Sequence, residues 1–294
     1  MLCQREEPEN LDLLENCILE PKYDGSRNLF FIDFEHNYFR IQHRSLADYT
    51  EKYPEFNLEE LRKIFNKNCK SIILDGELIA KDFEVVLSRN NLSDIQKIQM
   101  SSKLNPVKFI AFDCLMINNQ DIRFLPLQHR KYCLSKAIEK KNNLIEVIQF
   151  WEEDFSTRYQ ELVDWGFEGV VCKDKSSEYL SKRTSFWLKI KPLQIDEFKV
   201  IGYNEKSGRS SYGSMKTDRG DVGLLTWANL EEFNKLLDEV GLERIWVEVE
   251  YQKLNPSGKA RFPIFRRFVV KPSEKYQSLT SEENEDVEDL KIGV

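Results

Sequence analysis

Four residues that could do chemistry lie within six positions near the start of the chain, in the segment KYDGSR that begins at Lys22. Gly25 and Ser26 favour a bend, and the apolar run from Asn28 is typical of a strand. One interpretation is a surface hairpin whose charges form ordinary salt bridges. The other is that Lys22 is a nucleophile, because a lysine amine attacks electrophiles once its surroundings favour the neutral form. The remaining motifs have to decide between the two.

Two carboxylates and an aromatic ring occur inside predicted strands. In SIILDGELIA, Asp75 and Glu77 share one face of a strand whose other face is apolar. Such a strand is either simply amphipathic or presents its carboxylates to a cation or to ribose hydroxyls. In KFIAFDCLMI, Phe112 lies within an apolar run, where it is either part of the core or a platform for a base.

Two further motifs place charge beside buried strands. In GFEGVVCK, Glu168 precedes a glycine at the start of a predicted strand, as a turn carboxylate or as a site residue. In FWLKIKP, Lys189 and Lys191 lie on one strand face, about 7 Å apart from the rise of two residues. Two such charges repel unless an anion lies between them, although a solvated edge strand that discourages aggregation has the same pattern. The motif is therefore compatible with an anion site or with an edge strand.

Elements that alternate in an α+β manner position these motifs. Strands are predicted at 29–34, 39–43, 71–80, 107–116, 170–173 and 186–191, the first two as a hairpin, and helices at 57–66, 128–140 and 156–165. After Pro192 the pattern changes to short strands, one helix within 230–241 and the strictly alternating IWVEVEY. Short strands with one helix in about 80 residues are typical of a small OB-type barrel. A domain boundary is therefore expected near residue 192.

Composition excludes some classes of protein. The chain has 294 residues, 41% of them hydrophobic, which is enough for one large domain or two ordinary ones. Its net charge is −7, but residues 1–20 and 273–294 each carry −5, so the body between them is +3 and can bind nucleic acid along a local stripe. No apolar run could span a membrane and the start lacks a secretory signal core, so an intracellular protein is expected. Six cysteines without a CxxC pair, and only three histidines, argue against a zinc centre.

In order along the chain, KYDGSR, LDGEL, FIAFDCL, EGVV and WLKIKP resemble the nucleotidyltransferase motifs of ATP-dependent DNA ligases and mRNA capping enzymes. The resemblance covers roughly residues 15–272. The wording of EGVV and WLKIKP, with RSLADYTEKYPEF, LPLQHR and GKARFPIF, favours the ligases, and the short stretch before Lys22 is similar to that of compact two-domain forms. The resemblance implies an α+β nucleotidyltransferase (adenylation) domain with antiparallel sheets and flanking helices at 1–192, a small OB-fold barrel at 193–276 and an acidic flexible tail at 277–294.

The same resemblance implies a role for each motif residue. Lys22 would attack the α-phosphorus of ATP to form lysyl-AMP, and it would have to be neutral to do so. Glu20 would recognise the amino group of adenine, and Phe112 would stack on the adenine. Glu77 would hold the ribose or a metal-bound water.

Charged groups would surround the phosphates. Lys189 and Lys191 would neutralise the charge that builds on the α-phosphate and favour the neutral amine of Lys22. Glu168 would help to place Mg²⁺, for which Mn²⁺ would substitute, and Asp24 would either orient Lys22 or bind the metal. The residues implied to contact the ribose and phosphates of the nucleotide or the nick are Arg27 and Arg44.

The last motif departs from the family pattern. The family usually ends with Arg-x-Asp-Lys, which helps to expel pyrophosphate, and this chain has Val269, Val270, Lys271 and Pro272 there. The basic residues that could substitute in contacting pyrophosphate are Arg266, Arg267, Lys271 and Lys275. The polar loop at 206–219, rich in cations, is expected either to contact DNA phosphates or to be solvated.

The activity implied is the sealing of nicks in duplex DNA by a monomer that binds no membrane. AMP would pass from ATP to Lys22 and then to the 5′-phosphate of the nick, and the 3′-hydroxyl would expel it. One alternative is an RNA ligase or a capping-type guanylyltransferase on the same fold, which nucleotide and substrate choice would distinguish. Another is an inactive nucleic-acid-binding protein derived from a ligase. The joint presence of Lys22, Glu77, Glu168, Lys189 and Lys191 argues against it.

Overall fold

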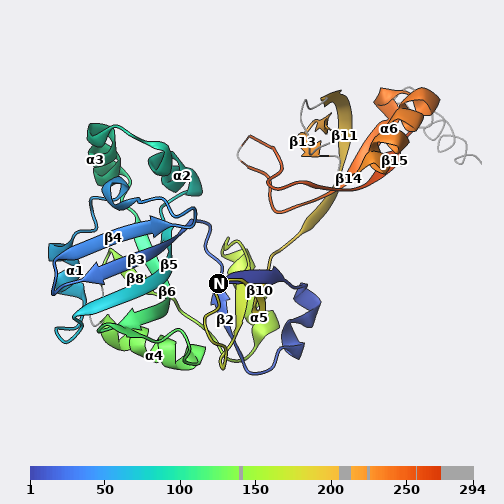
Figure 1. Cartoon of the computed structure of the whole chain (residues 1–294). Helices are drawn as coiled ribbons and strands as arrows, with labels where there is room; N and C mark the ends of the chain where they lie inside the picture. The colour runs from blue at the N-terminus through green and yellow to red at the C-terminus, as the bar shows by residue number, and fades with distance from the viewer. Residues whose placement is uncertain (139–141, 205–212, 224–225, 256, 273–294) are drawn as a thin grey trace, which may run out of the picture. The chain divides into compact units, whose positions relative to one another are not determined.

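The computed structural model describes residues 1–138, 142–204, 213–223, 226–255 and 257–272. Contacts between Cα atoms divide the chain into two compact units, Met1–Lys191 and Pro192–Val294 (Figure 1). The predicted tail at 277–294, Lys275 and part of the polar loop, residues 205–212, lie outside the described residues. No helix in the described ranges is long and apolar enough to cross a membrane.

The first unit contains a six-stranded sheet of order β4-β3-β5-β6-β7, with β8 also paired to β6 (Figure 1). Its strands are β3 (Ser26–Asp33), β4 (Tyr38–His43), β5 (Ser71–Ile79), β6 (Lys108–Ile117), β7 (Gln120–Asp121) and β8 (Ile145–Val147). Side chains of β3 alternate between buried and partly exposed, as in a strand with one core face. The predicted hairpin of β3 and β4 is confirmed. Apolar side chains such as Phe30, Leu74 and Phe109 form the main core.

A four-stranded sheet of order β1-β10-β9-β2 is the second layer of this unit. Its strands are β1 (Leu2–Arg5), β2 (Cys17–Pro21), β9 (Val170–Asp174) and β10 (Arg183–Ile190). Both sheets are mainly antiparallel, as predicted, but β1 pairs with β10 and β8 pairs with β6 in parallel. Parallel neighbours are joined by crossovers rather than hairpins. The local sequence pattern therefore did not indicate these two pairs.

Helices flank the sheets of the first unit, which is an α+β fold as predicted. They are α1 (Leu58–Ile64), α2 (Phe83–Asn91), α3 (Ile95–Leu104), α4 (Leu127–Ala137) and α5 (Phe155–Asp164), with 3₁₀ turns at Pro8–Leu13 and Thr50–Lys52. The side chain of Asn57 caps α1 by accepting the backbone N–H of Glu60 at 3.0 Å. Helix α4 packs on β6 and is shorter than the predicted 128–140, because Ile138 is already extended.

In its described residues the second unit has five strands and one α-helix, and one of these strands, at Ser214–Thr217, lies within the segment 206–219 that the sequence analysis gave as a polar loop. Its sheet has the order β13-β12-β11-β14-β15, and every pair is antiparallel. The elements are β11 (Gln194–Asn204), β12 (Ser214–Thr217), β13 (Gly220–Gly223), α6 (Trp227–Val240), a 3₁₀ turn (Leu242–Arg244), β14 (Ile245–Tyr251) and β15 (Ile264–Val270). Thr226 caps α6 by accepting the backbone N–H of Asn229 at 3.2 Å. Phe198, Phe233 and Val247 lie in its core.

Candidate active site

A cavity of about 270 Å³ in the first unit is lined by strands of both sheets. Strands β3, β5 and β6 contribute from one sheet, and β2, β9 and β10 from the other. The cavity brings together every residue that the sequence predicts for catalysis and nucleotide binding. These residues are Glu20, Lys22, Arg27, Arg44, Glu77, Phe112, Lys189 and Lys191. They are separated by up to 171 positions in the chain.

Lys22 directly follows β2, and two backbone hydrogen bonds fix its position. Its N–H donates to the carbonyl of Gly169 at 2.8 Å, and the N–H of Glu168 donates to the carbonyl of Lys22 at 3.0 Å. Gly169 has φ +124°, and a Cβ there would lie 2.1 Å from the carbonyl oxygen of Ile190. Only glycine fits this close approach of backbones. The glycine of EGVV therefore allows Lys22, Glu168 and the end of β10 to meet.

The amine of Lys22 forms an ion pair with Glu168 Oε2, and Lys191 binds the other oxygen of the same carboxylate. Burial opposes ionisation of Glu168, but Lys22 and Lys191 outweigh it and lower the pKa of the carboxyl. Glu168, predicted as a metal residue, thus bridges two lysines. An ion pair favours the charged form of each partner. Lys22 must therefore leave Glu168 before its amine can attack an electrophile.

Glu77 is a carboxylate of the cavity that, unlike Glu168, is not paired with a lysine. It lies on β5 opposite Arg27 on β3, and it forms no hydrogen bond or ion pair with any described residue. Burial raises its pKa from 4.5 to about 8, although the charges of Lys22 and Arg27 act in the opposite direction. The ionised form of a carboxylate with a raised pKa and no partner in the protein is strongly stabilised when a cation binds to it from solution.

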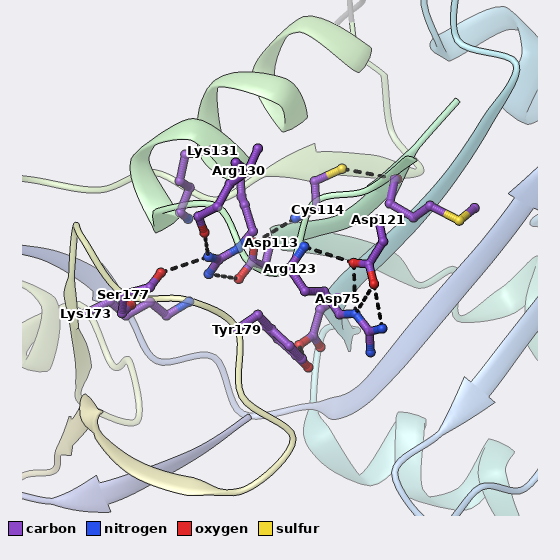
Figure 2. A network of polar contacts seen from close by, with 12 residues as sticks. Asp75, Asp113, Cys114, Asp121, Arg123, Arg130, Lys131, Lys173, Ser177 and Tyr179 are labelled. Atoms are coloured by element: carbon purple, nitrogen blue, oxygen red, sulfur yellow. Dashed lines mark hydrogen bonds and ion pairs between the residues drawn. The ribbon is translucent and has the colours of Figure 1, made fainter. Parts of the chain in front are cut away.

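Asp75, the other acid of β5, is already paired. Arg27 donates to both of its oxygens, at 3.0 and 2.6 Å, and the hydroxyl of Tyr179 donates to Oδ2 at 2.8 Å. Tyr179 belongs to the segment between β9 and β10, so this network joins the two sheets beside the cavity (Figure 2). Asp75 therefore positions Arg27 and is not available as a ligand group.

Aromatic rings line the part of the cavity next to Glu20. Phe112 on β6 meets Trp187 on β10 edge to face, with ring centroids 6.0 Å apart. Lys173 Nζ lies 4.4 Å from the Phe112 centroid and 3.8 Å from that of Trp187, and 2.7 Å from Glu20 Oε2. The indole N–H of Trp187 is buried without an acceptor among the described residues. An apolar slot with a few polar groups at its end suits a planar heterocycle.

Cations also line the cavity. Lys189 and Arg183 project from β10, Lys191 follows it and Arg44 follows β4. Burial lowers the pKa of Lys189, and the neighbouring charges of Lys191 and Arg183 lower it further. Several cations this close repel one another, and an anion between them relieves the repulsion. The lining thus combines aromatic rings with cations that favour an anion.

The remaining predicted residues lie elsewhere. Asp24 does not line the cavity. The three basic residues of the last motif belong to the second unit, where each has an acidic partner on another strand of the sheet, β14 for the two arginines and β11 for Lys271. These pairs are Arg266 with Glu250 at 3.2 Å, Arg267 with Glu248 at 2.7 Å and Lys271 with Glu197 at 2.7 Å. A phosphate would have to compete with these carboxylates.

Residues of the site that were not predicted from the sequence include Lys131, Lys173, Arg183 and Trp187. For Lys131 a signal was present. The buried positions of α4 follow helical spacing, and they are Leu127, Arg130, Lys131, Leu134 and Ala137. Two cations in such a stripe indicate buried ion pairs. For Lys173 and Trp187 the strand pattern indicates only that the side chains are buried, and not that they belong to a site.

A family model described as "ATP dependent DNA ligase domain" matches residues 1–191, which is the whole of the first unit. The chain belongs to this family. DNA ligase 4 of Candida albicans is 30% identical to the chain in an alignment 262 positions long that covers 78% of this chain and 28% of that protein. A probable DNA ligase of Dictyoglomus turgidum is 26% identical over 81% of this chain and 47% of its own length. This member of the ligase domain family thus spans half or less of these curated relatives.

Solved structures agree on the fold. A Lig E DNA ligase superposes with a TM-score of 0.64 over 91% of this chain and 98% of its own, at 19% identity. At that identity the likeness concerns architecture alone. The residue-level description of this ligase-family chain therefore rests on its own geometry.

Proposed function

We propose that this chain is an ATP-dependent DNA ligase that seals nicks in duplex DNA through a lysyl-AMP intermediate. The observation that supports this most is that one cavity is lined by Lys22, by the rings of Phe112 and Trp187 and by a set of cations. A nucleotide matches both kinds of lining, since its base is planar and its phosphates are anionic. The family match and the relatives named DNA ligase support ligation rather than RNA capping.

In this proposal the base occupies the slot beside Phe112 and Trp187, with its amino group toward Glu20. Arg27, held by Asp75, contacts the ribose. The phosphates lie toward Lys189 and Lys191, so that the α-phosphorus is next to Lys22. The interactions are electrostatic and positional, as phosphoryl transfer requires.

The first step forms a P–N bond and breaks a P–O bond. Lys22 attacks as the neutral amine, after its ammonium proton has passed to solvent. A P–N bond to the α-phosphorus forms, the bond from that phosphorus to the bridging oxygen breaks, and pyrophosphate leaves. The nitrogen then gives up a second proton to solvent, which leaves the neutral phosphoramidate nitrogen. Lys191 can keep the charge of Glu168 paired when Lys22 departs.

Two transfers to DNA complete the reaction. A 5′-phosphate oxygen attacks the α-phosphorus of lysyl-AMP, the P–N bond breaks, and the leaving nitrogen takes up two protons from solvent to restore the Lys22 ammonium. The 3′-hydroxyl then attacks the activated 5′-phosphorus, giving up its proton, and AMP leaves. Lys189 and Arg44 offer positive charge to the phosphate in each transfer.

The residues present fit a magnesium ion. Magnesium in phosphoryl-transfer sites takes one or two carboxylates, with phosphate oxygens and waters completing its shell. Glu77 is such a carboxylate, half-buried and without a protein partner in the described ranges, and the charge of Glu168 acts on it. When bound, the ion would offset phosphate charge and polarise the α-phosphate. Asp24 is a further candidate, and like Glu168 it is not among the residues that line the cavity.

The second unit would act as an OB-fold that engages the duplex. Its five antiparallel strands and one helix suit such a barrel, which supports the division at 1–192 and 193–276. Pyrophosphate release would use Arg266, Arg267 and Lys271 only if each left its carboxylate partner and bound a phosphate oxygen instead. The chain would work as a monomer inside the cell.

The test is covalent labelling. Purified protein is incubated with Mg²⁺ and α-³²P-ATP or α-³²P-GTP, denatured and resolved by electrophoresis, and half of each sample is chased with nicked duplex DNA. We expect a label from ATP alone that the nick removes as it is sealed. Lys22→Ala should take no label, whereas Lys175→Ala, a lysine paired with Glu152 outside this cavity, should behave as wild type. A label from GTP would indicate a guanylyltransferase, and no label with no sealing would refute the proposal.

A further inference from the structure

Two lysines from different elements hold the carboxylate of Glu20. Its side chain is buried and reaches the cavity from β2. Lys173 Nζ lies 2.7 Å from Oε2, and Lys131 Nζ, from α4, binds Oε1. A carboxylate oxygen has two acceptor positions, so each oxygen can accept one more hydrogen bond. Glu20 is thus a charged acceptor that can still receive an N–H from a ligand.

Lys131 approaches Glu20 from behind the nucleotide cavity. It does not line that cavity, but borders a second one of about 330 Å³, where its Nζ lies 5.5 Å from the ring centroid of Phe150. The neighbouring Arg130 binds Asp113 of β6 at 2.9 Å and anchors this turn of α4 (Figure 2). Lys131 is therefore held in place by the fold, and its ammonium acts on a ligand through Glu20.

We propose that Lys131 is a positioning residue that makes the site select a purine with a 6-amino group, because its ion pair fixes the carboxylate of Glu20 in the orientation that accepts an N–H. The proposal rests on the proposed function in taking the cavity as the site of the base. A carboxylate oxygen held in place accepts an N–H from a 6-amino group but offers no donor to a 6-oxo oxygen. It therefore repels a 6-oxo oxygen. A buried acceptor that is held in position also disfavours a ligand that does not donate a hydrogen bond to it.

Lys131 is better suited to a test than Lys173. Lys173 lines the cavity and contacts both aromatic rings, so its removal would alter the stacking surface as well as Glu20. Removal of Lys131 leaves Phe112 and Trp187 in place. Its effect on base selection can therefore be separated from an effect on stacking.

The ion pair also gives a pH dependence that needs no substitution. Burial lowers the pKa of Lys131 to about 8, with a further lowering by Lys173, while Glu20 and Asp113 act in the opposite direction. These three groups face the ammonium from β9, β2 and β6. Below this pH Lys131 is charged, and above it the proton is lost. The preference for a 6-amino purine should weaken as the pH rises through this value.

The experiment compares equilibrium binding of ATP and of purine riboside 5′-triphosphate, which lacks the 6-amino group, by calorimetry in the presence of Mg²⁺. The full-length wild type, Lys131→Met and Lys131→Arg are measured at pH 6.5, and the wild type also at pH 9.5. We expect the preference for ATP to fall about tenfold in Lys131→Met and to be largely kept in Lys131→Arg. Lys175→Met is the matched control, because Lys175 borders the same second cavity but binds Glu152 at 2.9 Å.

The ratio of the dissociation constants for ATP and for purine riboside 5′-triphosphate shows whether Lys131 acts in base selection. If Lys131→Met weakens both ligands equally, or the wild-type ratio is the same at both pH values, Lys131 has a structural role only and the inference is wrong. The pH comparison decides even if Lys131→Met does not fold. Binding is measured apart from covalent labelling, so a protein that selects ATP through Lys131 but takes no label would retain this inference and lose the proposed function. Equal binding of both ligands by the wild type would overturn the inference.

Discussion

Replacement of Glu77 by Gln should make the protein more stable and less active. Glu77 is a carboxylate on β5 that faces the cavity without a hydrogen bond or ion pair in the described ranges. Burial raises its pKa from 4.5 to about 8. Folding therefore binds a proton between these two values, and stability is lost as the pH rises through them. Glutamine has nearly the same shape and does not carry that cost.

The size of the effect follows from the shift. A change from 4.5 to about 8 corresponds to at most ~5 kcal/mol once the group is ionised in the folded state. The side chain is only partly covered, because it borders an open cavity, so about half of that is expected, ~2 to 3 kcal/mol. The gain of Glu77→Gln over wild type should be near zero at pH 4.5 and reach this value above pH 8.

Urea unfolding at pH 4.5, 6.5 and 8.5 measures the difference in free energy of unfolding between the two proteins. Glu168→Gln is the matched control of opposite sign, because the pKa of Glu168 is lowered by its lysine partners despite burial. That variant should lose stability at pH 8.5 and lose less as the pH falls. Labelling from ATP should drop in both variants. The reasoning is refuted if Glu77→Gln is no more stable than wild type at pH 8.5, or if its gain does not change with pH.

Three further changes test other parts of the structure. Phe112→Ala should weaken ATP binding about 10- to 100-fold in calorimetry through lost base stacking, with little change if the base lies elsewhere. Arg130→Met should lower the free energy of unfolding in urea by about 3 to 5 kcal/mol, because it leaves the buried Asp113 without its partner; a loss below ~1 kcal/mol would contradict this. Lys271→Ala should change stability by less than ~1 kcal/mol, since its pair with Glu197 is partly exposed, and a slower labelling step without slower sealing of pre-adenylylated nicks would give it a role in pyrophosphate release.

The sequence predicted the strands that carry the motifs because each strand has its own local signal. Alternation along β3 and the apolar run of β6 mark those strands without knowledge of their neighbours. The cavity residues then follow, since Lys22, Glu77 and Phe112 lie on or beside such strands. Short strands whose pairing is distant, such as β1 against β10, carry no comparable signal.

The partners of the charged groups could not be predicted in the same way. Glu20 binds Lys131 across 111 positions, and Lys22 binds Glu168 across 146. Which lysine meets which carboxylate depends on how α4 and the two sheets pack, and side-chain periodicity reports only that a residue is buried. The sequence thus predicted a metal role for Glu168, which stays a prediction, but it did not predict that Glu168 bridges Lys22 and Lys191.

Among the acids around the cavity, Glu77 is the one that best tests where a cation binds. Glu20 binds two lysines, Glu168 binds two lysines and Asp75 binds Arg27, so these three acids are neutralised within the protein. Glu77 is not, and its high pKa shows that burial outweighs the more distant charges of Lys22 and Arg27. A group that destabilises the empty site and is stabilised by a divalent cation couples metal binding to folding stability. Saturating Mg²⁺ with ATP should therefore stabilise the wild type more than Glu77→Gln, and equal stabilisation would mean that the cation binds away from Glu77.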